Sequence, residues 1–211
     1  MEPVKGYDSE TQRTLTPRQR AANWWAYHKL QLGIAAAVLL LLLFFVLQDR
    51  AIPAPDYTVG WVSARELDGP AAERLSRRLA GYGRDLNGDG QVYVELHQIT
   101  LDLRAVLERG AQGQNELGEL MALEADLDVG QSGIFITDDP AAFQAQTGAL
   151  LYRDGSLPVA GAQDWERMVI SWEEEGLGPV YAGLRGCWKE DWQETWALYQ
   201  ELWAGLAAAA A

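Results

Sequence analysis

One unbroken run of apolar residues, Leu32 to Leu47, dominates the hydrophobic pattern of the chain. It contains five consecutive leucines and neither a charged residue nor a proline. Counted from Leu30, the segment has 18 positions and would form about 27 Å of α-helix, close to the roughly 30 Å hydrocarbon core of a bilayer. Backbone polar groups can pair there only within the segment. We therefore expect residues 30–48 to be a transmembrane helix in contact with the lipid bilayer.

The charges around this run predict its orientation. The basic residues before it are Lys5, Arg13, Arg18, Arg20 and Lys29. Positive charge beside a first helix favours the cytoplasmic side, so we expect a cytoplasmic N-terminus and an extracellular C-terminal domain at the plasma membrane. A cleaved signal peptide is the alternative. It fits less well, because the run exceeds the usual core of about 7–15 residues and no clean small-x-small site follows Leu47.

Strand patterns alternate with helical patterns beyond the apolar run. The expected strands are 57–63, 92–101 and 133–137, and the expected helices are 70–82, 115–128 and one that starts at Asp139-Pro140. Right-handed crossovers in such a β-α-β-α-β-α order predict a mostly parallel sheet covered by helices. Short strands at 149–152, 167–172 and 179–184 and a long helix from about Lys189 would complete one three-layer-like α/β domain.

These patterns divide the chain into five parts. They are a disordered cytoplasmic tail (1–29), the transmembrane helix (30–48), a proline-containing spacer (49–55), the extracellular α/β domain (56–206) and a frayed alanine tail (207–211). About 156 residues beyond the spacer suffice for one domain with a real core.

The charge and the cysteine content limit which molecules the chain can bind and which disulfides it can form. From Asp49 onward there are 27 acidic and 12 basic side chains, so this part of the chain should repel nucleic acid and anionic lipid and favour cationic partners. Cys187 is the only cysteine and cannot form an internal disulfide. We expect it to be a buried thiol, with an intermolecular bridge as the alternative.

One motif carries recognisable chemistry. Residues 85–90 read Asp-x-Asn-x-Asp-Gly, in which alternate side chains of a tight loop can converge on calcium. The expected metal ligands are Asp85, Asn87, Asp89, the carbonyl of Gln91 and Glu95. The motif departs from an EF-hand, because Leu96 occupies the twelfth position and Glu95 precedes it by one; Asp102 is another possible acidic ligand. The alternative is an Asx/Gly turn without a metal.

The segment that contains this motif also resembles segments of other proteins. The segment Asp-Leu-Asn-Gly-Asp-Gly-Gln-Val-Tyr-Val-Glu-Leu, followed by Gly-Ile-Phe-Ile-Thr-Asp-Asp-Pro, resembles a set of uncharacterised single-pass membrane proteins of Gram-positive bacteria over about residues 57–160. This resemblance implies no particular activity. A fainter likeness is to one lobe of extracellular solute-binding proteins, although this chain has about half the length of a two-lobed binder.

The other candidates have plain structural alternatives. A C-terminal stripe could dock a partner or a sugar, or could close the core; it consists of Trp188, Trp192, Trp196, Tyr199, Trp203 and Leu206. Asp138-Asp139 could be paired carboxylates at a strand end or a helix cap. His97 shares a strand face with Glu95 and Tyr93.

These observations predict a non-enzymatic function. No nucleophile-elbow, zinc-protease, P-loop or Cys-x-x-Cys motif is present in the sequence. We expect a membrane-anchored extracellular binding or accessory module of unknown ligand, stabilised by calcium. The alternative is a solute-binding-like lobe that presents a small ligand to a membrane transporter, using strand ends near Ser63, Gln98 and Asp138. A hydrolase that uses Glu95, His97 or Asp138 is a third hypothesis.

Overall fold

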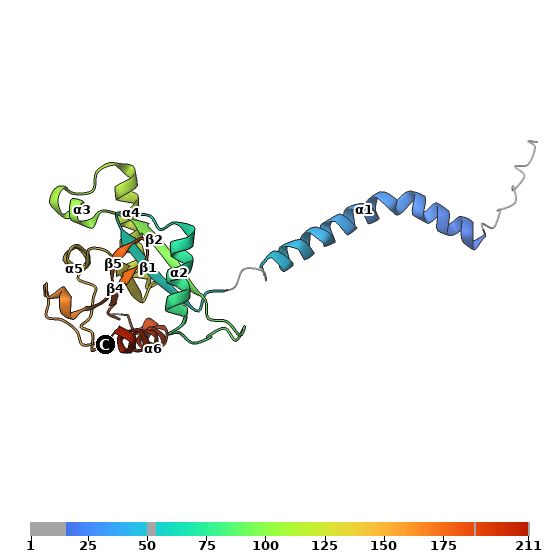
Figure 1. The fold of residues 1–211 in the computed structure, drawn as a ribbon. Helices are drawn as coiled ribbons and strands as arrows, with labels where there is room; N and C mark the ends of the chain where they lie inside the picture. The colour runs from blue at the N-terminus through green and yellow to red at the C-terminus, as the bar shows by residue number, and fades with distance from the viewer. Residues whose placement is uncertain (1–15, 50–53, 188, 211) are drawn as a thin grey trace, which may run out of the picture. The chain divides into compact units, whose positions relative to one another are not determined.

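The computed structural model describes residues 16–49, 54–187 and 189–210, and the chain forms two compact units, Met1–Pro53 and Ala54–Ala211. The first unit contains helix α1 (Pro17–Asp49), shown in Figure 1. Its start is a reciprocal cap, because the Gln19 N–H donates to Thr16 Oγ1 and the Thr16 N–H donates to Gln19 Oε1. The helix therefore begins 13 residues before the expected boundary at 30 and includes part of the expected tail; residues 1–15 lie outside the described part.

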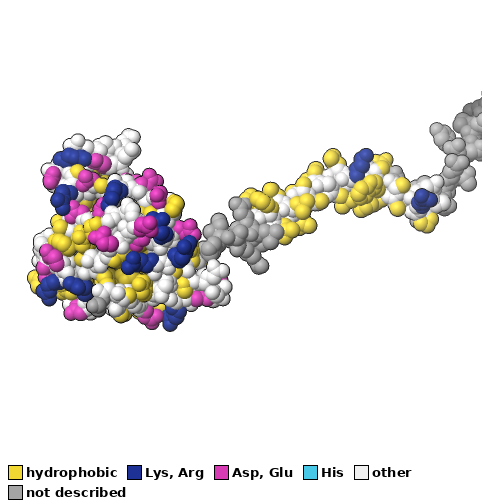
Figure 2. Space-filling model, in the orientation of Figure 1, with side chains coloured by type: hydrophobic (Ala, Val, Ile, Leu, Met, Phe, Trp, Pro, Cys, Tyr) yellow, Lys and Arg dark blue, Asp and Glu magenta, His cyan; other side chains and the backbone are white. Residues whose placement is uncertain are grey.

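Helix α1 is long and apolar enough to cross a membrane. The candidate span lies within Pro17–Phe45, and none of its most apolar window is buried. Figure 2 shows a helix surface made mostly of hydrophobic side chains, whereas the visible face of the second unit mixes acidic and basic groups. Trp24, Trp25 and Tyr27 are exposed near its basic end. The structure thus confirms one helix suited to a bilayer, while its orientation stays a prediction.

The second unit is an α/β domain around a five-stranded sheet. Its strands are β1 (Tyr57–Ser63), β2 (Val94–Thr100), β3 (Ile134–Thr137), β4 (Val169–Glu174) and β5 (Gly178–Leu184), in the spatial order β2-β1-β3-β5-β4. β1 is parallel to β2 and β3, but β5 is antiparallel to β3 and β4. The sheet is therefore mixed rather than mostly parallel. Only three residues join β4 to β5, which permits a hairpin but no crossover.

In the described residues of the second unit, five helices surround the sheet. They are α2 (Gly69–Ala80), α3 (Leu103–Arg109), α4 (Gly113–Val129), α5 (Pro140–Thr147) and α6 (Gln193–Ala210), with short 3-10 turns η1 (Trp165–Arg167) and η2 (Glu190–Trp192). Asp139 caps α5 as expected, because its Oδ1 accepts the Ala142 N–H at 3.1 Å. Helix α3 was not expected, and the expected strand at 149–152 is reduced to one bridge between Leu150 and Arg185. The described alanines 207–210 belong to α6.

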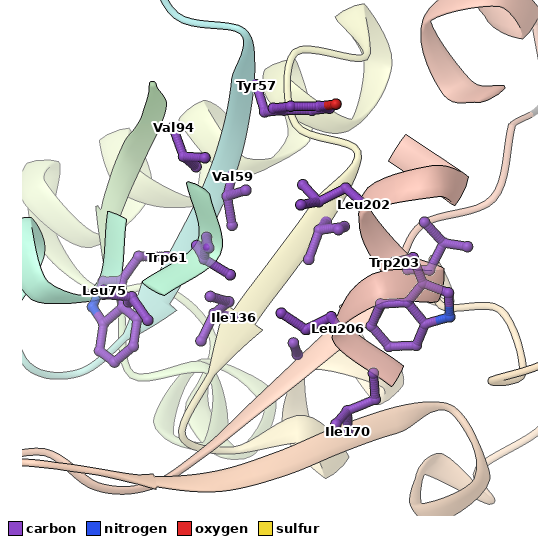
Figure 3. Close-up of a cluster of buried hydrophobic side chains, with 14 of the residues drawn as sticks. Tyr57, Val59, Trp61, Leu75, Val94, Ile136, Ile170, Leu202, Trp203 and Leu206 are labelled. Carbon is purple, nitrogen blue, oxygen red and sulfur yellow. The ribbon is translucent and has the colours of Figure 1, made fainter. Parts of the chain in front are cut away.

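The helices bury both faces of the sheet and so make three layers. On one face, α2 and α6 pack on side chains of the strands; Figure 3 shows Trp61 of β1 beside Leu75 of α2, and Ile136 of β3 beside Leu206 of α6. On the other face, α3, α4 and α5 pack on a second cluster that includes Val62, Ile99, Phe135, Phe143 and Leu123. Two separate apolar clusters within 54–210 supply the hydrophobic stabilisation of the domain.

The C-terminal stripe closes the core. Tyr199, Leu202, Trp203 and Leu206 are buried against the sheet. The indole N–H of Trp203 donates to the carbonyl of Arg153 at 3.1 Å, and that of Trp196 donates to the carbonyl of Arg185 at 2.9 Å. Trp188, the first member of the expected stripe, lies outside the described residues. These contacts account for most of the stripe as core rather than as a docking face.

Tyr199 also completes the hydrogen bonding of β1. Strand β3 is four residues long and its pairing with β1 begins at Val59, so it does not reach Thr58. The Thr58 N–H donates to the Tyr199 hydroxyl at 2.9 Å, and that hydroxyl donates to the Thr58 carbonyl at 3.0 Å. Burial raises the pKa of this phenol, so it remains a neutral donor. A side chain of α6 thereby replaces a missing strand residue.

An ion pair joins α3 to α4. The Arg109 guanidinium donates to both oxygens of Glu116, at 2.9 and 2.7 Å, and the Gln112 N–H donates to the same carboxylate at 2.7 Å. The Arg109 hydrogen bonds, followed by the Gln112 N–H, lower the pKa of Glu116 to about 2. The pair is exposed to solvent, so its main effect is to orient the two helices.

Candidate functional sites

The Asp85–Gln91 loop is held by hydrogen bonds from its own backbone. Asp85 accepts the N–H groups of Gly88 at 2.6 Å and Gly90 at 2.8 Å. Asn87 Oδ1 accepts the Asp89 N–H, and Asp89 Oδ1 accepts the Gln91 N–H, each at 2.9 Å. Both glycines have positive φ, 75° and 87°, which only glycine adopts at little cost. The motif therefore folds into a tight loop whose side-chain oxygens turn inward on the backbone.

A residue outside the motif anchors this loop. Asp56, just before β1, accepts the N–H groups of Leu86 and Tyr93 at 2.7 and 2.8 Å and that of Asn87 at 3.2 Å. Burial alone would raise the pKa of Asp56, but these three N–H donors outweigh it and hold the pKa below its ordinary value. In addition, the carbonyl of Ala54 accepts a hydrogen bond from Asn87 Nδ2 at 2.9 Å. The loop is therefore held against the first residues of the domain.

The loop offers part of a calcium shell. Each carboxylate or amide oxygen has two lone pairs, so Asp85, Asn87 and Asp89 can accept an N–H and still face a cation, and the Gln91 carbonyl could add a fourth oxygen. Glu95 lies apart, exposed on β2 in register with Thr58. Among the described residues, no group of three or more His, Cys, Asp or Glu side chains is placed to hold a metal. The loop is complete as a turn, and calcium binding through a mixed set of oxygens stays a prediction.

A second candidate lies where the parallel strands end. Helix α2 follows β1 on one face and α5 follows β3 on the other, so the carboxyl ends of these adjacent strands form a switch point, the usual ligand position in open α/β sheets. There the Ser63 hydroxyl donates to Asp138 Oδ2 at 2.7 Å, and Arg65 Nη2 lies 3.7 Å from the same oxygen. A cavity of about 250 Å³ opens beside Asp138 and Asp139.

The polar groups of this crevice bind one another. Arg104 donates from Nε to Asp139 Oδ2 at 2.8 Å, in addition to the cap that Asp139 makes. Gln98, the third expected residue, is engaged elsewhere, because its Oε1 accepts the Leu67 N–H at 3.2 Å. The structure therefore brings Ser63 and Asp138 together as expected but leaves Gln98 out. Because the serine, the arginine and the two carboxylates already pair with one another, this region is better explained as a structural contact than as a ligand site.

No protein-family model, curated protein or solved structure matches the chain. The resemblance to single-pass membrane proteins of Gram-positive bacteria therefore stays a prediction, and so does the likeness to a solute-binding lobe.

His97 belongs to a buried polar network that the sequence did not reveal. Its Nδ1 lies 2.7 Å from Asp126 Oδ2, an oxygen that also accepts the Ser132 hydroxyl at 2.7 Å. The partner of His97 is thus a carboxylate of α4 and not Glu95, which shares its strand face by alternation. In a catalytic Ser–His–Asp arrangement the serine hydroxyl bonds to the histidine. Here both groups bond to the carboxylate of Asp126 rather than to each other, and the network joins β2, α4 and the residues just before β3.

The roles of Asp56 and Asp126 could therefore not be predicted from the sequence. Asp56 is 29 positions from the loop that it anchors, and Asp126 is 29 positions from His97. The hydrophobic residues of α4 are spread around the helix axis, so nothing in its sequence marked Asp126 as a buried carboxylate. No signal marked Asp56 either.

Proposed function

We propose that the chain is a membrane-anchored binding or accessory module, with its N-terminus in the cytoplasm and its α/β domain outside. The observation that carries this proposal is the uncovered apolar surface of α1, which only a bilayer or another protein could remove from water. The basic residues precede the apolar run, which supports the stated orientation. A calcium-stabilised loop at Asp85–Gln91 is part of the proposal.

The orientation can be measured by cysteine labelling. In a Cys187→Ser background, Val159→Cys places a thiol on an exposed loop of the domain, and Ser9→Cys places one in the N-terminal tail. We expect a membrane-impermeant maleimide to label only the Val159→Cys variant in intact cells and to label both after lysis. If only Ser9→Cys were labelled in intact cells, the orientation would be the reverse of the one proposed. If the chain were recovered in the soluble fraction, α1 would not be a membrane anchor.

The calcium loop predicts a metal-dependent melting temperature. For the full chain in mild detergent, calcium at about one hundred times its dissociation constant should stabilise the domain by about 2.7 kcal/mol. For this size of domain the melting temperature should rise by roughly 5–11 °C. We expect magnesium to produce a smaller shift and Asp89→Ala to abolish the calcium response.

Asp154 supplies the matched control. It also closes a short turn, because its Oδ1 accepts the Ser156 N–H at 2.9 Å, but it lies in another loop. Asp154→Ala should keep the calcium response. If the unmodified chain shows no shift up to millimolar calcium, Asp85–Gln91 is a turn and the calcium part of the proposal is wrong, while the anchor is unaffected.

The alternative function, a lobe that presents a small ligand to a transporter, has less support. It requires an open site at the strand ends, and there the Ser63 hydroxyl and the Arg104 guanidinium are paired with Asp138 and Asp139.

A further inference from the structure

Strand β4 lies at one edge of the sheet and pairs only with β5. The Arg185 N–H donates to the Gly133 carbonyl, so odd-numbered residues of β5 direct their backbone groups toward β3 and even-numbered ones toward β4. In the β4–β5 register, even-numbered residues lie opposite even-numbered ones. The N–H and C=O groups of Val169, Ser171 and Glu173 therefore point outward, away from the sheet.

This outer edge of β4 is open. Within the described residues, the outward backbone groups of these three residues have no hydrogen-bond partner. Just before the strand, the Arg167 carbonyl accepts the Arg153 N–H at 3.0 Å. A cavity of about 380 Å³ adjoins the edge, and its lining includes Ile170 and Ser171, whose side chains project to opposite faces of the sheet. An open edge without proline or bulge can pair with another strand.

The charges along β4 select the kind of strand that fits. Arg167, at the start, has a side chain that is 69% exposed, and Glu173 and Glu175, at the other end, are exposed too. A uniformly basic or uniformly acidic peptide would place like charges together at one end of this edge. A strand that is basic at its start and acidic at its end is complementary to an antiparallel copy of itself.

We propose that two copies of the chain pair antiparallel through β4, with a two-fold axis at Ser171, so that two sheets become one continuous sheet. Arg167 of one copy then lies opposite Glu175 of the second copy and diagonal to its Glu173, within reach of long side chains. Opposite-charge pairs of this kind occur twice, once on each side of the axis. The pairing depends on neither the anchor nor calcium.

The opposite face of β4 also suits this arrangement. Trp172 is half-buried, and in the proposed register it lies opposite Ile170 of the second copy, an aromatic pair with a β-branched residue. Ala207 and Ala210 of α6 line the adjoining cavity, and their small side chains leave room beside the strand. The second copy would therefore cover both the open backbone and apolar side chains next to it.

A disulfide at the axis tests the pairing. In a Cys187→Ser background, Ser171→Cys would place two thiols directly opposite each other, with Cα atoms about 5.5 Å apart, which a disulfide can bridge. The experiment oxidises the full chain in mild detergent with copper phenanthroline and follows the linked dimer on a non-reducing gel. We expect Ser171→Cys to form the dimer at least about tenfold faster than the two controls below, whose thiols lie beyond disulfide reach.

Two exposed positions supply the controls. In the proposed register the two copies of position 173 are four residue steps apart along the strands, about 14 Å, so Glu173→Cys should link slowly. Thr100→Cys places a thiol on β2, the opposite edge of the same sheet, and should also link slowly. The first control tests the register, and the second tests which edge is used.

Charge reversal tests the reason for self-pairing. In the Ser171→Cys background, Arg167→Glu or Glu175→Arg should each slow linking by about tenfold, because two symmetry-related pairs change sign. The double variant should recover most of the rate. Arg167 also bonds to Asp164 and lies over the Tyr152 ring in its own domain. Loss of those contacts cannot be repaired by a change at Glu175, so recovery would report on the contact between copies.

Fast linking at position 171 that is absent at 173 and 100 and recovers in the double variant would support the proposal. Linking of Ser171→Cys no faster than either control would overturn it, even for a chain that is dimeric by sedimentation, because association would then use another surface such as α1. A double variant that links no faster than the single reversals would overturn the proposed register.

Discussion

Substitution of Asp126 by alanine is expected to lower the free energy of unfolding by about 3–5 kcal/mol, the usual cost of breaking a buried ionic network by removing one partner. The side chain of Asp126 is fully buried. It accepts the N–H of Ser132 at 2.8 Å and the hydroxyl of Ser132 and Nδ1 of His97 at 2.7 Å each. Alanine would leave the N–H and hydroxyl of Ser132 buried without their acceptor, would take the partner from the half-buried His97 ring, and would remove the negative charge that acts on Arg185.

The measurement is urea or thermal unfolding of the full chain in mild detergent, followed by tryptophan fluorescence. The expected loss corresponds to a fall in melting temperature of roughly 6–20 °C for a domain of this size. Asp128→Ala is the matched control on the same helix, because its side chain is 79% exposed and pairs with Lys189 at the surface. The control should change stability by no more than about 1 kcal/mol. An equally small effect of Asp126→Ala would show that the buried network contributes little.

Substitution of Gly133 by alanine should also be strongly destabilising. A Cβ atom at this position would lie 2.2 Å from Cγ of the Tyr199 ring, far closer than two carbon atoms can approach. The ring must therefore move, at a cost of about 1–3 kcal/mol for overpacking. If the hydroxyl leaves Thr58, the unpaired N–H and carbonyl of β1 add roughly another 1–3 kcal/mol.

A double-mutant cycle tests this cause. Tyr199→Phe removes the hydroxyl alone, so Gly133→Ala should cost less in that background than in the unmodified chain. Gly118→Ala is the control, because a Cβ there meets nothing within 4 Å and the position lies inside α4. It should stabilise the domain by about 0.5–1 kcal/mol, the opposite sign. If both glycine substitutions raised stability, the close contact between Gly133 and Tyr199 would be wrong.

Several elements could be predicted because their signals are local. The five strands and most helices lie close to the ranges expected from hydrophobic periodicity, and Asp139-Pro140 marks the first turn of α5. Helix α1 shows the limit of a hydropathy argument, because its early start depends on the Thr16–Gln19 cap rather than on apolar residues. Helix α3 has seven residues, too few for a helical period to stand out.

The candidate sites likewise divide into features with local signals, which the sequence predicts, and features that depend on distant residues. The loop Asp85–Gln91 was recognisable because its hydrogen bonds, apart from those to Asp56 and Ala54, join neighbouring residues. The anchor Asp56 and the network around Asp126 were not recognisable, because their partners are distant in the sequence. The carboxylates at the strand ends were expected, but their pairing with Ser63 and Arg104 depends on how the end of β1, helix α3 and the residues between β3 and α5 meet.

The sequence by itself determined that the chain has one long apolar helix, an α/β domain and a tight Asp-x-Asn-x-Asp-Gly loop. These features depend on helix and strand periods, capping side chains and glycine φ angles, which act over a few residues. Only the tertiary structure decided the antiparallel direction of β5, the role of Tyr199 as a substitute for a strand residue, and the position of β4 at an open edge of the sheet. Those features arise when segments far apart in the chain pack together, because burial then requires every polar group to find a partner and every ring to find space.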